Sequence, residues 1–329
     1  MVQLGILLTQ HNRLLSVAAI LDVFESVNRF YRLDGETPFF NINIIGAGNA
    51  DNAHYSQYKI QSFEADTQFD VVLIPALACE DMRQAITENS KYFNWICGQY
   101  QQGAEVACVC TGAFLLAAAG LLNGKTASTH MDSADIFAKT FPLVNLQAHA
   151  VVTQDQRIYT SGGATSTFHL LLQLIENHCG RDMAIRIAKY FAIDMDREHQ
   201  AYFGTFKPIE NHEDDLVKKL QERIKKDYAT MTSIEGMLDD IPASRRNLFR
   251  RFKQATGNTP IEYVQKVRIE AAKRALEKAS GNVQESMFES GYSDLKTFRE
   301  LFKKTVGITP SEYRSKYSRK AVDVEESRK

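Results

Sequence analysis

The sequence lacks the features that mark a membrane protein or a common nucleotide-binding site. It has no long apolar run, and its first residues, MVQLGILLTQHNR, carry no basic flank before one. We therefore expect neither a signal peptide nor a transmembrane span. A P-loop is missing, and Gly46-Ala47-Gly48 falls short of a full dinucleotide-binding fingerprint.

Cysteine is scarce. The chain has 5 cysteines, an odd number, in apolar or strand-like surroundings: Cys79, Cys97, Cys108, Cys110 and Cys179. Disulfide frameworks use paired cysteines in secreted proteins, so a reduced, cytoplasmic setting fits better. Cys108 and Cys110 alternate faces of one strand, so their thiols cannot easily meet one metal ion beside His130. We expect no metal and no cofactor.

The chain has almost no net charge, but its charge is unevenly distributed. The whole sequence carries a formal charge of −1, with 39 Lys and Arg against 40 Asp and Glu. Residues 241–320 contain 18 Lys and Arg against 8 Asp and Glu, which leaves +10 there and −11 elsewhere. A basic segment attached to an acidic remainder predicts a domain that binds a polyanion.

The first ~200 residues alternate between strand and helix patterns. Short apolar runs of buried-strand length are Val2–Leu8, Phe40–Ile45, Val71–Pro75 and Glu105–Cys110. Amphipathic stretches are Leu15–Tyr31, Asp81–Ala85, Tyr92–Tyr100, Thr165–His178 and Arg181–Tyr190. Leu146–Val152 and Arg157–Ser161 are predicted to pair around Gln154-Asp155. This alternation predicts an α/β domain with a largely parallel, flavodoxin-like layered sheet.

The pattern changes between Phe203 and Asp215, where Gly, Pro and an acidic run interrupt the apolar periodicity. We predict an N-terminal α/β domain over 1–205, a linker over 206–213, an all-α domain over 214–318 and a charged tail over 319–329. The predicted helices of the second domain are 214–226, 233–238, 244–256, 261–278, 283–290, 294–306 and 311–317.

The C-terminal third repeats itself at a spacing of 50 residues. Leu248–Tyr263 reads LFRRFKQATGNTPIEY, and Phe298–Tyr313 reads FRELFKKTVGITPSEY. A periodic self-match indicates a duplicated supersecondary unit. Each copy has a short helix, a turn, a basic helix and a Gly-x-Thr-Pro stop. This is the outline of a helix-turn-helix, which is typical of DNA binding.

Helical spacing separates the buried and exposed sides of each basic helix. In the second copy, Gly291 can take a positive φ in the turn, and Ser293 or Asp294 can cap the helix. Phe298 and Phe302 should face the core, as should Leu248 and Phe252 in the first copy. The spacing leaves the other side of each helix exposed, including Asn247, Lys253 and Lys303. From this exposed set we predict as DNA-binding residues Arg245, Arg246, Phe249, Arg250, Lys296, Thr297, Arg299 and Glu300.

About 105 residues at the C-terminal end resemble the AraC-type DNA-binding domain. The resemblance rests on NLFRRFKQATGNTPIEYVQKVRIEAAKRALE and VQESMFESGYSDLKTFRELFKKTVGITPSEYR. It implies base-facing positions at Arg246, Phe249 and Arg250, and at Lys296, Thr297 and Glu300. The chain departs from the family pattern in the first turn, 240–243, which has no Gly, and at Glu300, where Arg is common.

In the N-terminal domain, a strand, a sharp turn and a helix follow one another over EVACVCTG and Ala113–Ala119. Cys110 falls at the turn, where the amides of a helix N-terminus would lower its pKa. His130 follows in the sequence. A Cys and a His could form a nucleophilic pair, but a buried Cys can equally serve packing alone.

The segments VCTGAFLLAAAGLLNGKTASTH, LLSVAAILDVF and YTSGGATSTFHLLLQLIE resemble the DJ-1/PfpI family. More closely, they resemble the class I glutamine amidotransferase-like half of GlxA-type transcription regulators. The resemblance implies that Cys110 occupies the nucleophile elbow with His130 close by, and that Thr111, Ser16 and Ala76 line the same pocket. Three positions depart from enzymatic members. Ser16 replaces a Glu, Ala76-Leu77-Ala78 replaces Gly-Gly, and Met131 replaces a Trp.

These patterns together predict a transcriptional regulator that is not an enzyme. The expected partners are double-stranded DNA, a small-molecule effector and a second copy of the chain, in the cytoplasm and at the nucleoid when bound. Small polar nitrogen compounds are the effectors that the resemblance implies. Two alternatives remain open: a Cys110-dependent amidase or glyoxalase-like deglycase attached to a DNA-binding module, and a redox sensor that uses Cys110.

Overall fold

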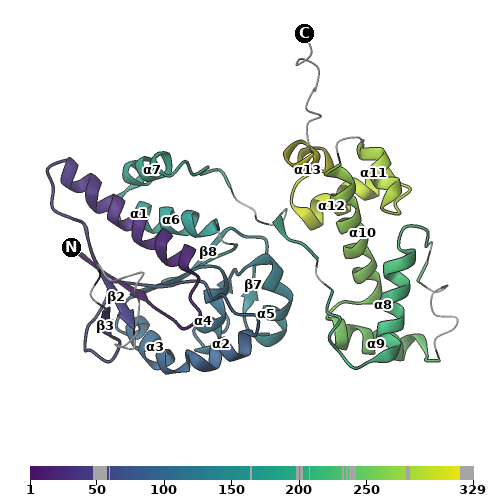
Figure 1. Cartoon of the computed structure of the whole chain (residues 1–329), viewed down its shortest axis with the longest axis horizontal. Coiled ribbons are helices and arrows are strands. Elements are labelled where there is room, and N and C mark those ends of the chain that lie inside the picture. Colours follow the sequence, from purple (N-terminus) through teal and green to yellow (C-terminus); the bar gives the residue numbers. More distant parts are fainter. Residues whose placement is uncertain are drawn as a thin grey trace, which may run out of the picture. The chain divides into compact units, whose positions relative to one another are not determined.

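The computed structural model in Figure 1 divides the chain into two compact units, Met1–Gln200 and Ala201–Lys329. It describes residues 1–46, 58, 60–163, 165–197, 200, 203–206, 208–231, 233–234, 236, 242–278 and 282–318. The predicted helix at 233–238 lies partly outside these residues, as does the turn at 240–243, and the tail at 319–329 lies wholly outside them.

The N-terminal unit is built on a seven-stranded sheet in the described part of the chain, with strand order β3-β2-β1-β4-β5-β9-β8. The strands are β1 (Val2–Leu7), β2 (Phe40–Gly46), β3 (Ile60–Ser62), β4 (Val71–Ile74), β5 (Glu105–Cys108), β8 (Val152–Asp155) and β9 (Ile158–Ser161). All neighbours pair in parallel except β8 and β9. A small second sheet pairs β6 (Thr126–Ala127) with β7 (Asn145–Leu146).

Helices cover both faces of this sheet (Figure 1). One face packs against α1 (Leu14–Leu33), α6 (Ser166–Cys179) and α7 (Arg181–Tyr190), and the other against α2 (Met82–Glu88), α3 (Phe93–Gln101), α4 (Ala113–Ala118) and α5 (Ala134–Thr140). Short 3₁₀ turns lie at Ser90–Tyr92, Cys110–Gly112 and Met131–Ser133. Because both faces are covered, most residues of the central strands are buried, and β4 is buried along its whole length. The predicted α/β layered fold is confirmed.

The hairpin at the sheet edge differs from the one that the sequence predicts. Leu146–Val152 is not one strand, because β7 ends at Leu146 and β8 begins only at Val152. Gln154-Asp155, expected in the turn, lies in β8. The turn falls two residues later, where Gln156 has a φ of 55°. Such turns usually carry Gly or Asn, so a Gln there gave no signal in the sequence.

The C-terminal unit is helical. Its helices are α8 (Asp215–Asp227), α9 (Arg245–Thr256), α10 (Pro260–Leu276), α11 (Val283–Glu289), α12 (Leu295–Val306) and α13 (Pro310–Tyr317). One core forms around α8 and α9 and a second around α11, α12 and α13, and α10 contributes to both. The repeat seen in the sequence therefore appears as two cores that share one long helix.

The two copies end their basic helices in the same way. Gly257 and Gly307 follow α9 and α12 with left-handed φ values of 78° and 87°. Thr259 and Thr309 then cap the next helix, each in a capping box with the Glu three residues later and with Pro at the first helical position. The shared Gly-x-Thr-Pro pattern thus fixes the angle at which each helix pair turns.

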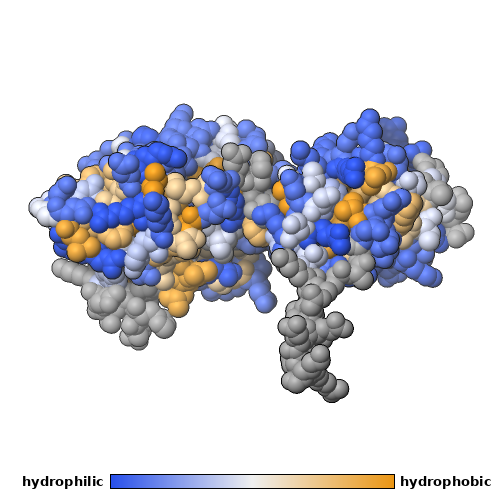
Figure 2. All heavy atoms as spheres, turned by 90° about the horizontal axis from the view of Figure 1, so that it is seen from above, coloured by the Kyte–Doolittle hydropathy of each residue, from blue (hydrophilic) through white to orange (hydrophobic). Residues whose placement is uncertain are grey.

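The surface of both units is mostly hydrophilic on the face drawn in Figure 2, with smaller apolar patches between charged side chains. Among the residues that the structure describes, no helix combines the length and the apolar content needed to cross a bilayer. Exposed large apolar side chains are spread over both units, and they include Leu33, Leu143 and Phe288.

Candidate nucleic-acid interface and cysteine elbow

Helix α12 begins and packs as the sequence predicts. The Asp294 side chain caps it by accepting a hydrogen bond of 2.8 Å from the Thr297 amide. Phe298 and Phe302 are fully buried. Gly291 in the preceding turn has a φ of 84°, and a Cβ there would lie 2.8 Å from the Ala229 carbonyl oxygen. Glycine is therefore required both by the backbone conformation and by the close approach of the chain after α8.

Helix α9 is attached to α8 by an ion pair. Arg251 donates two hydrogen bonds of 2.7 Å to the two carboxylate oxygens of Asp214, which also caps α8. These bonds hold the pKa of Asp214 below its ordinary value. Leu248 and Phe252 are fully buried, as predicted. A bidentate pair fixes orientation as well as distance, so it determines how α9 presents its outer side.

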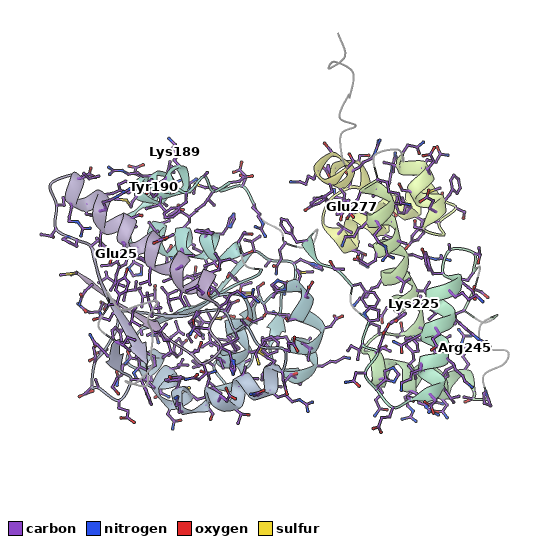
Figure 3. The ribbon with its side chains drawn as sticks, viewed as in Figure 1. Glu25, Lys189, Tyr190, Lys225, Arg245 and Glu277 are labelled. Atoms are coloured by element: carbon purple, nitrogen blue, oxygen red, sulfur yellow. The ribbon has the colours of Figure 1, made fainter. Side chains whose placement is uncertain are left out.

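The residues predicted to face DNA lie on the outer sides of α9 and α12. Arg245, labelled in Figure 3, lies at the start of α9, and its guanidinium stands 5.2 Å from the centre of the half-buried Phe249 ring. The other predicted side chains are all exposed: Arg246, Arg250, Lys296, Thr297, Arg299 and Glu300. The charged residues among these are all basic on α9, where they lie beside Phe249, whereas Glu300 makes the outer side of α12 mixed in charge. Base contact by these residues remains a prediction.

A contact that the sequence gave no reason to expect joins the two copies. Arg268 on α10 donates to the Tyr228 carbonyl at 2.8 Å and to the Met231 carbonyl at 2.7 Å, both after the end of α8. Its guanidinium also lies 5.5 Å from the centre of the Tyr292 ring, in the turn before α12. Arg268 therefore links the first copy to the turn of the second.

In the N-terminal unit, Cys110 occupies a sharp turn directly after β5. Its φ is 57°, a conformation that non-glycine residues rarely adopt. The following Gly112 passes so close to β4 that a Cβ there would lie 2.7 Å from the Pro75 carbonyl oxygen. The Thr129 hydroxyl donates to the Cys110 carbonyl at 3.1 Å. The strand, turn and helix expected from the sequence are confirmed.

Two side-chain hydroxyl groups accept hydrogen bonds from backbone amides in the loop after β4. The Ser16 hydroxyl donates to the Arg13 carbonyl at 2.7 Å and accepts from the Ala76 amide at 3.1 Å. The Thr111 hydroxyl accepts from the Leu77 amide and donates to the Leu77 carbonyl, both at 2.8 Å. The structure thus joins Ser16 to Ala76 and places Thr111 beside Leu77. Both amides already have hydrogen-bond partners.

The expected activation of the Cys110 thiol is wrong. Only 3% of Cys110 is exposed, and burial raises the pKa of its thiol. Hydrogen bonds with Thr111 and the charge of Arg13 act in the opposite direction but are smaller effects. The amides of a helix N-terminus favour the thiolate, but the loss of water around the buried sulfur disfavours it more strongly.

His130 and Gln200 lie on neighbouring loops. His130 caps the turn Met131–Ser133, where its Nδ1 accepts from the Asp132 amide at 3.1 Å. Gln200 is 1% exposed. Its side chain accepts from the Gly163 amide at 2.6 Å and donates to the Thr129 carbonyl at 2.9 Å. Sequence reasoning missed Gln200, because no local pattern distinguishes a Gln that will be buried.

No group of three or more His, Cys, Asp or Glu side chains in the described residues is arranged to hold a metal ion. Cys108 and Cys110 belong to the cores on opposite faces of the sheet, as their spacing predicted.

Two family models match the chain in separate segments. Residues 47–177 match the DJ-1/PfpI family, and residues 239–316 match a helix-turn-helix domain. The regulator GbdR from Pseudomonas aeruginosa is 26% identical over 227 residues, which is 68% of this chain and 61% of GbdR. The regulator GlxA from Rhizobium meliloti is 26% identical over 222 residues, which is 64% of this chain and 65% of GlxA. Both are described as HTH-type transcriptional regulators, and the matched region is less than two thirds of each.

Among solved structures, the N-terminal fold is similar to DJ-1beta from Drosophila melanogaster, with a TM-score of 0.46 and 17% identity. That match covers 58% of this chain and 98% of the other. The family matches agree with the residues that carry the two resemblances in the sequence. The chain therefore joins a domain of the DJ-1/PfpI family to a C-terminal AraC-type helix-turn-helix domain.

Proposed function

We propose that this protein is a sequence-specific DNA-binding transcriptional regulator. The observation that carries the proposal is the duplicated pair of recognition helices. Phe252 and Phe302 are fully buried at matching positions and anchor α9 and α12 to their cores. Both helices end in the same Gly-x-Thr-Pro pattern. Their exposed sides carry Arg, Lys and Thr, which are side chains that read bases and bind phosphates. The relatives described as HTH-type transcriptional regulators support the same function.

The two helices have different parts in this proposal. On the exposed side of α9, Arg245, Arg246 and Arg250 can each bind phosphate or the edge of a guanine. In α12, Lys296 and Thr297 lie in the first turn, where side chains reach base edges, and Glu300 can accept a hydrogen bond from a cytosine amine. Because the outer side of α12 carries both acidic and basic side chains, α12 contributes more to base selectivity. Because the charged residues on the outer side of α9 are basic, α9 contributes more to DNA affinity.

The test is selection of genomic fragments with the full-length protein, followed by binding titrations at several salt concentrations. We expect a defined site whose affinity falls steeply as salt rises, because phosphate contacts release counterions. Arg246→Ala should weaken binding by about 5- to 100-fold, equivalent to ~1–3 kcal/mol. Lys225→Ala is the matched control, since this exposed Lys of α8 is not on either recognition helix (Figure 3). Equal loss in both variants would contradict site-specific readout.

We propose further that the DJ-1/PfpI domain senses a ligand and does not catalyse a reaction. Three features support this. Ser16 stands where enzymatic members have an acid, burial raises the pKa of the Cys110 thiol, and the Ala76 and Leu77 amides are bonded to side-chain hydroxyls. Backbone amides already held in this way cannot stabilise an oxyanion without losing these bonds. The left-handed φ of Cys110 is the one feature that favours the alternative, a Cys110-dependent activity.

In this proposal an effector binds near Cys110, Thr111 and His130 and shifts the chain between two states. Gln200 supports the coupling, because it is buried against Thr129, next to His130, where the chain leaves the N-terminal unit. We also propose that the regulator acts as a homodimer. Sedimentation of the full-length protein with and without DNA tests the dimer. A monomer bound to DNA at all concentrations would contradict it.

A further inference from the structure

The N-terminal unit has a second pocket, separate from the cysteine elbow. It has a volume of about 450 Å³, and its lining comes from α6, from β8 with the residue before it, and from Arg181 and residues 195–197. This is within the size range of small-molecule sites. Cys110, Thr111, Ser16 and His130 are not part of the described lining. Neither the sequence patterns nor the proposed effector site near Cys110 accounts for this pocket.

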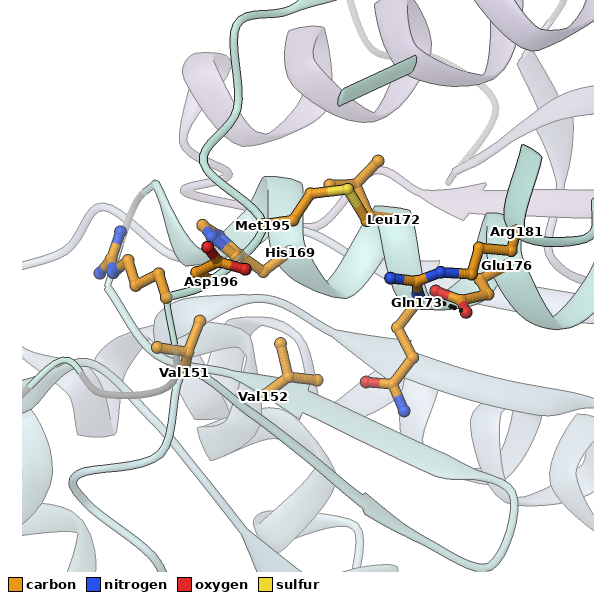
Figure 4. Close-up of a pocket in the computed structure, with 10 residues that line it drawn as sticks. Val151, Val152, His169, Leu172, Gln173, Glu176, Arg181, Met195 and Asp196 are labelled. Carbon is orange, nitrogen blue, oxygen red and sulfur yellow. Dashed lines mark hydrogen bonds and ion pairs between the residues drawn. The ribbon is translucent and has the colours of Figure 1, made fainter. Parts of the chain in front are cut away.

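The lining combines an apolar middle with charged ends. Figure 4 shows Val151, Val152, Leu172 and Met195 around the middle. His169 and Asp196 lie together on one side, and Glu176 and Arg181 lie together on the other. With Arg197, the lining holds two carboxylates and two guanidinium groups, so its formal charges cancel. A balanced pocket favours a ligand that carries both signs over a simple anion or cation.

His169 offers a specific hydrogen-bond acceptor at one end. Its Nε2 lies 2.9 Å from the Asp194 carbonyl oxygen. A carbonyl can only accept, so Nε2 donates, and Nδ1 of the neutral ring is left as an acceptor. This Nδ1 is buried and has no hydrogen-bond partner among the residues that the structure describes. Buried polar atoms of this kind are rare in folded proteins, and a ligand that donates an N–H would satisfy it.

Arg181 supplies the opposite end. Arg181 is the first residue of α7, where the partial positive charge of the helix N-terminus disfavours a cation. Helix stability therefore does not explain why an Arg stands at this position. One guanidinium nitrogen donates to Glu176 at 2.9 Å, and 65% of the Arg181 side chain is exposed. A guanidinium has five N–H donors, so Arg181 can bind a ligand carboxylate while it keeps the bond to Glu176.

We propose that this pocket binds a small zwitterion, with its carboxylate on Arg181, its ammonium group at His169 Nδ1 and Asp196, and a short apolar chain between Val152 and Leu172. Each part of the ligand corresponds to one part of the lining. The chemical class is that of ω-amino carboxylates. This site does not depend on the DNA-binding function, since occupancy is measured on the protein alone.

Isothermal titration calorimetry on the full-length protein tests the ligand class. The probes are the ω-amino acids from γ-aminobutyrate to ε-aminocaproate, with hexanoate and hexylamine as analogues that keep only one charged end. We expect at least one ω-amino acid to bind, and both single-ended analogues to bind about tenfold more weakly or worse, because each leaves one end of the pocket without its partner. No binding by any of the ω-amino acids would overturn the proposal, and so would equal binding by hexanoate.

Two variants locate the binding site. Arg181→Gln removes the carboxylate partner, and His169→Gln keeps an N–H donor for the Asp194 carbonyl while replacing the rigid ring acceptor Nδ1 with an amide oxygen on a flexible side chain. Each should weaken binding about tenfold or more. Lys189→Gln is the matched control, because it removes one exposed charge from the same helix (Figure 3). Cys110→Ser should also leave binding unchanged. If Cys110→Ser abolishes binding and His169→Gln does not, the ligand occupies the elbow and the proposal is wrong.

Discussion

Replacing Thr111 with Val tests whether hydroxyl groups hold the elbow loop in place. Val has nearly the shape of Thr but cannot form hydrogen bonds. In the structure the Thr111 hydroxyl bridges the amide and the carbonyl of Leu77, both at 2.8 Å. Leu77 is 1% exposed, so solvent cannot replace the lost partner. The substitution therefore leaves two buried backbone groups unsatisfied.

The expected loss of stability follows from these two groups. An unsatisfied buried donor or acceptor costs about 1–3 kcal/mol, so the loss of two partners in Thr111→Val should destabilise the N-terminal unit by about 2–6 kcal/mol. For a denaturant slope of about 3 kcal/mol per M in urea, the unfolding midpoint falls by about 0.7–2 M. Thr111→Ser keeps the hydroxyl and loses one methyl group, so its cost should be about 1 kcal/mol.

Tryptophan fluorescence is a selective assay for this effect. The chain has 1 Trp, Trp95, which lies in α3 of the N-terminal unit, so its emission follows unfolding of that unit. Urea titrations of wild type, Thr111→Val and Thr111→Ser give the three midpoints. If the Val and Ser variants unfold at the same concentration, the hydroxyl bridge does not stabilise the loop, and the reasoning on the occupied amides fails.

Three further predictions concern packing, pH and reactivity. Phe302→Ala removes a fully buried ring and should destabilise the helical unit by ~3–5 kcal/mol, measured by circular dichroism during thermal unfolding; a change below 1 kcal/mol is inconsistent with its burial. Hydrogen bonds from Arg251 lower the pKa of Asp214 in the folded protein. Their contribution to folding stability is therefore complete above the unfolded-state pKa of about 3.9, and it is lost as the pH falls through the lower folded-state pKa. Asp214→Asn should therefore cost stability at pH 7 and little at the acid end of the titration, and a constant cost would argue against the ion pair. Burial raises the pKa of Cys110, so iodoacetamide at neutral pH should label the half-buried Cys79 first, as peptide mapping would show; faster labelling of Cys110 would indicate an activated nucleophile.

Local sequence patterns were sufficient to predict α8 to α13, whereas the predicted helix at 233–238 lies partly outside the described residues. The apolar spacing in α12 identified Phe298 and Phe302 as core residues, and Asp294 and Gly291 marked the start of the helix and its turn. These features depend on residues within one or two helical turns of each other, so the spacing of residue types along the sequence is enough to predict them. The same holds for the turn at Cys110, which lies where a short apolar strand meets a helix.

Long-range contacts explain what the sequence could not predict. The Ser16 hydroxyl meets the Ala76 amide across 60 positions, and the Gln200 amide meets the Thr129 carbonyl across 71. The apolar periodicity of one segment does not indicate which distant residue its side chains will hydrogen-bond. The pKa of Cys110 was misjudged for the same reason, because burial of the thiol depends on packing from several distant segments.

The most direct test of the central claim is a base-by-base substitution scan of the selected DNA site with wild type, Arg246→Ala and Lys296→Ala. Two recognition helices in one unit predict two clusters of sensitive bases, about one helical turn or ~34 Å apart. Arg246→Ala should remove sensitivity from one cluster and Lys296→Ala from the other. A single cluster, or loss at the same bases in both variants, would contradict the account of α9 and α12 as separate readers of DNA.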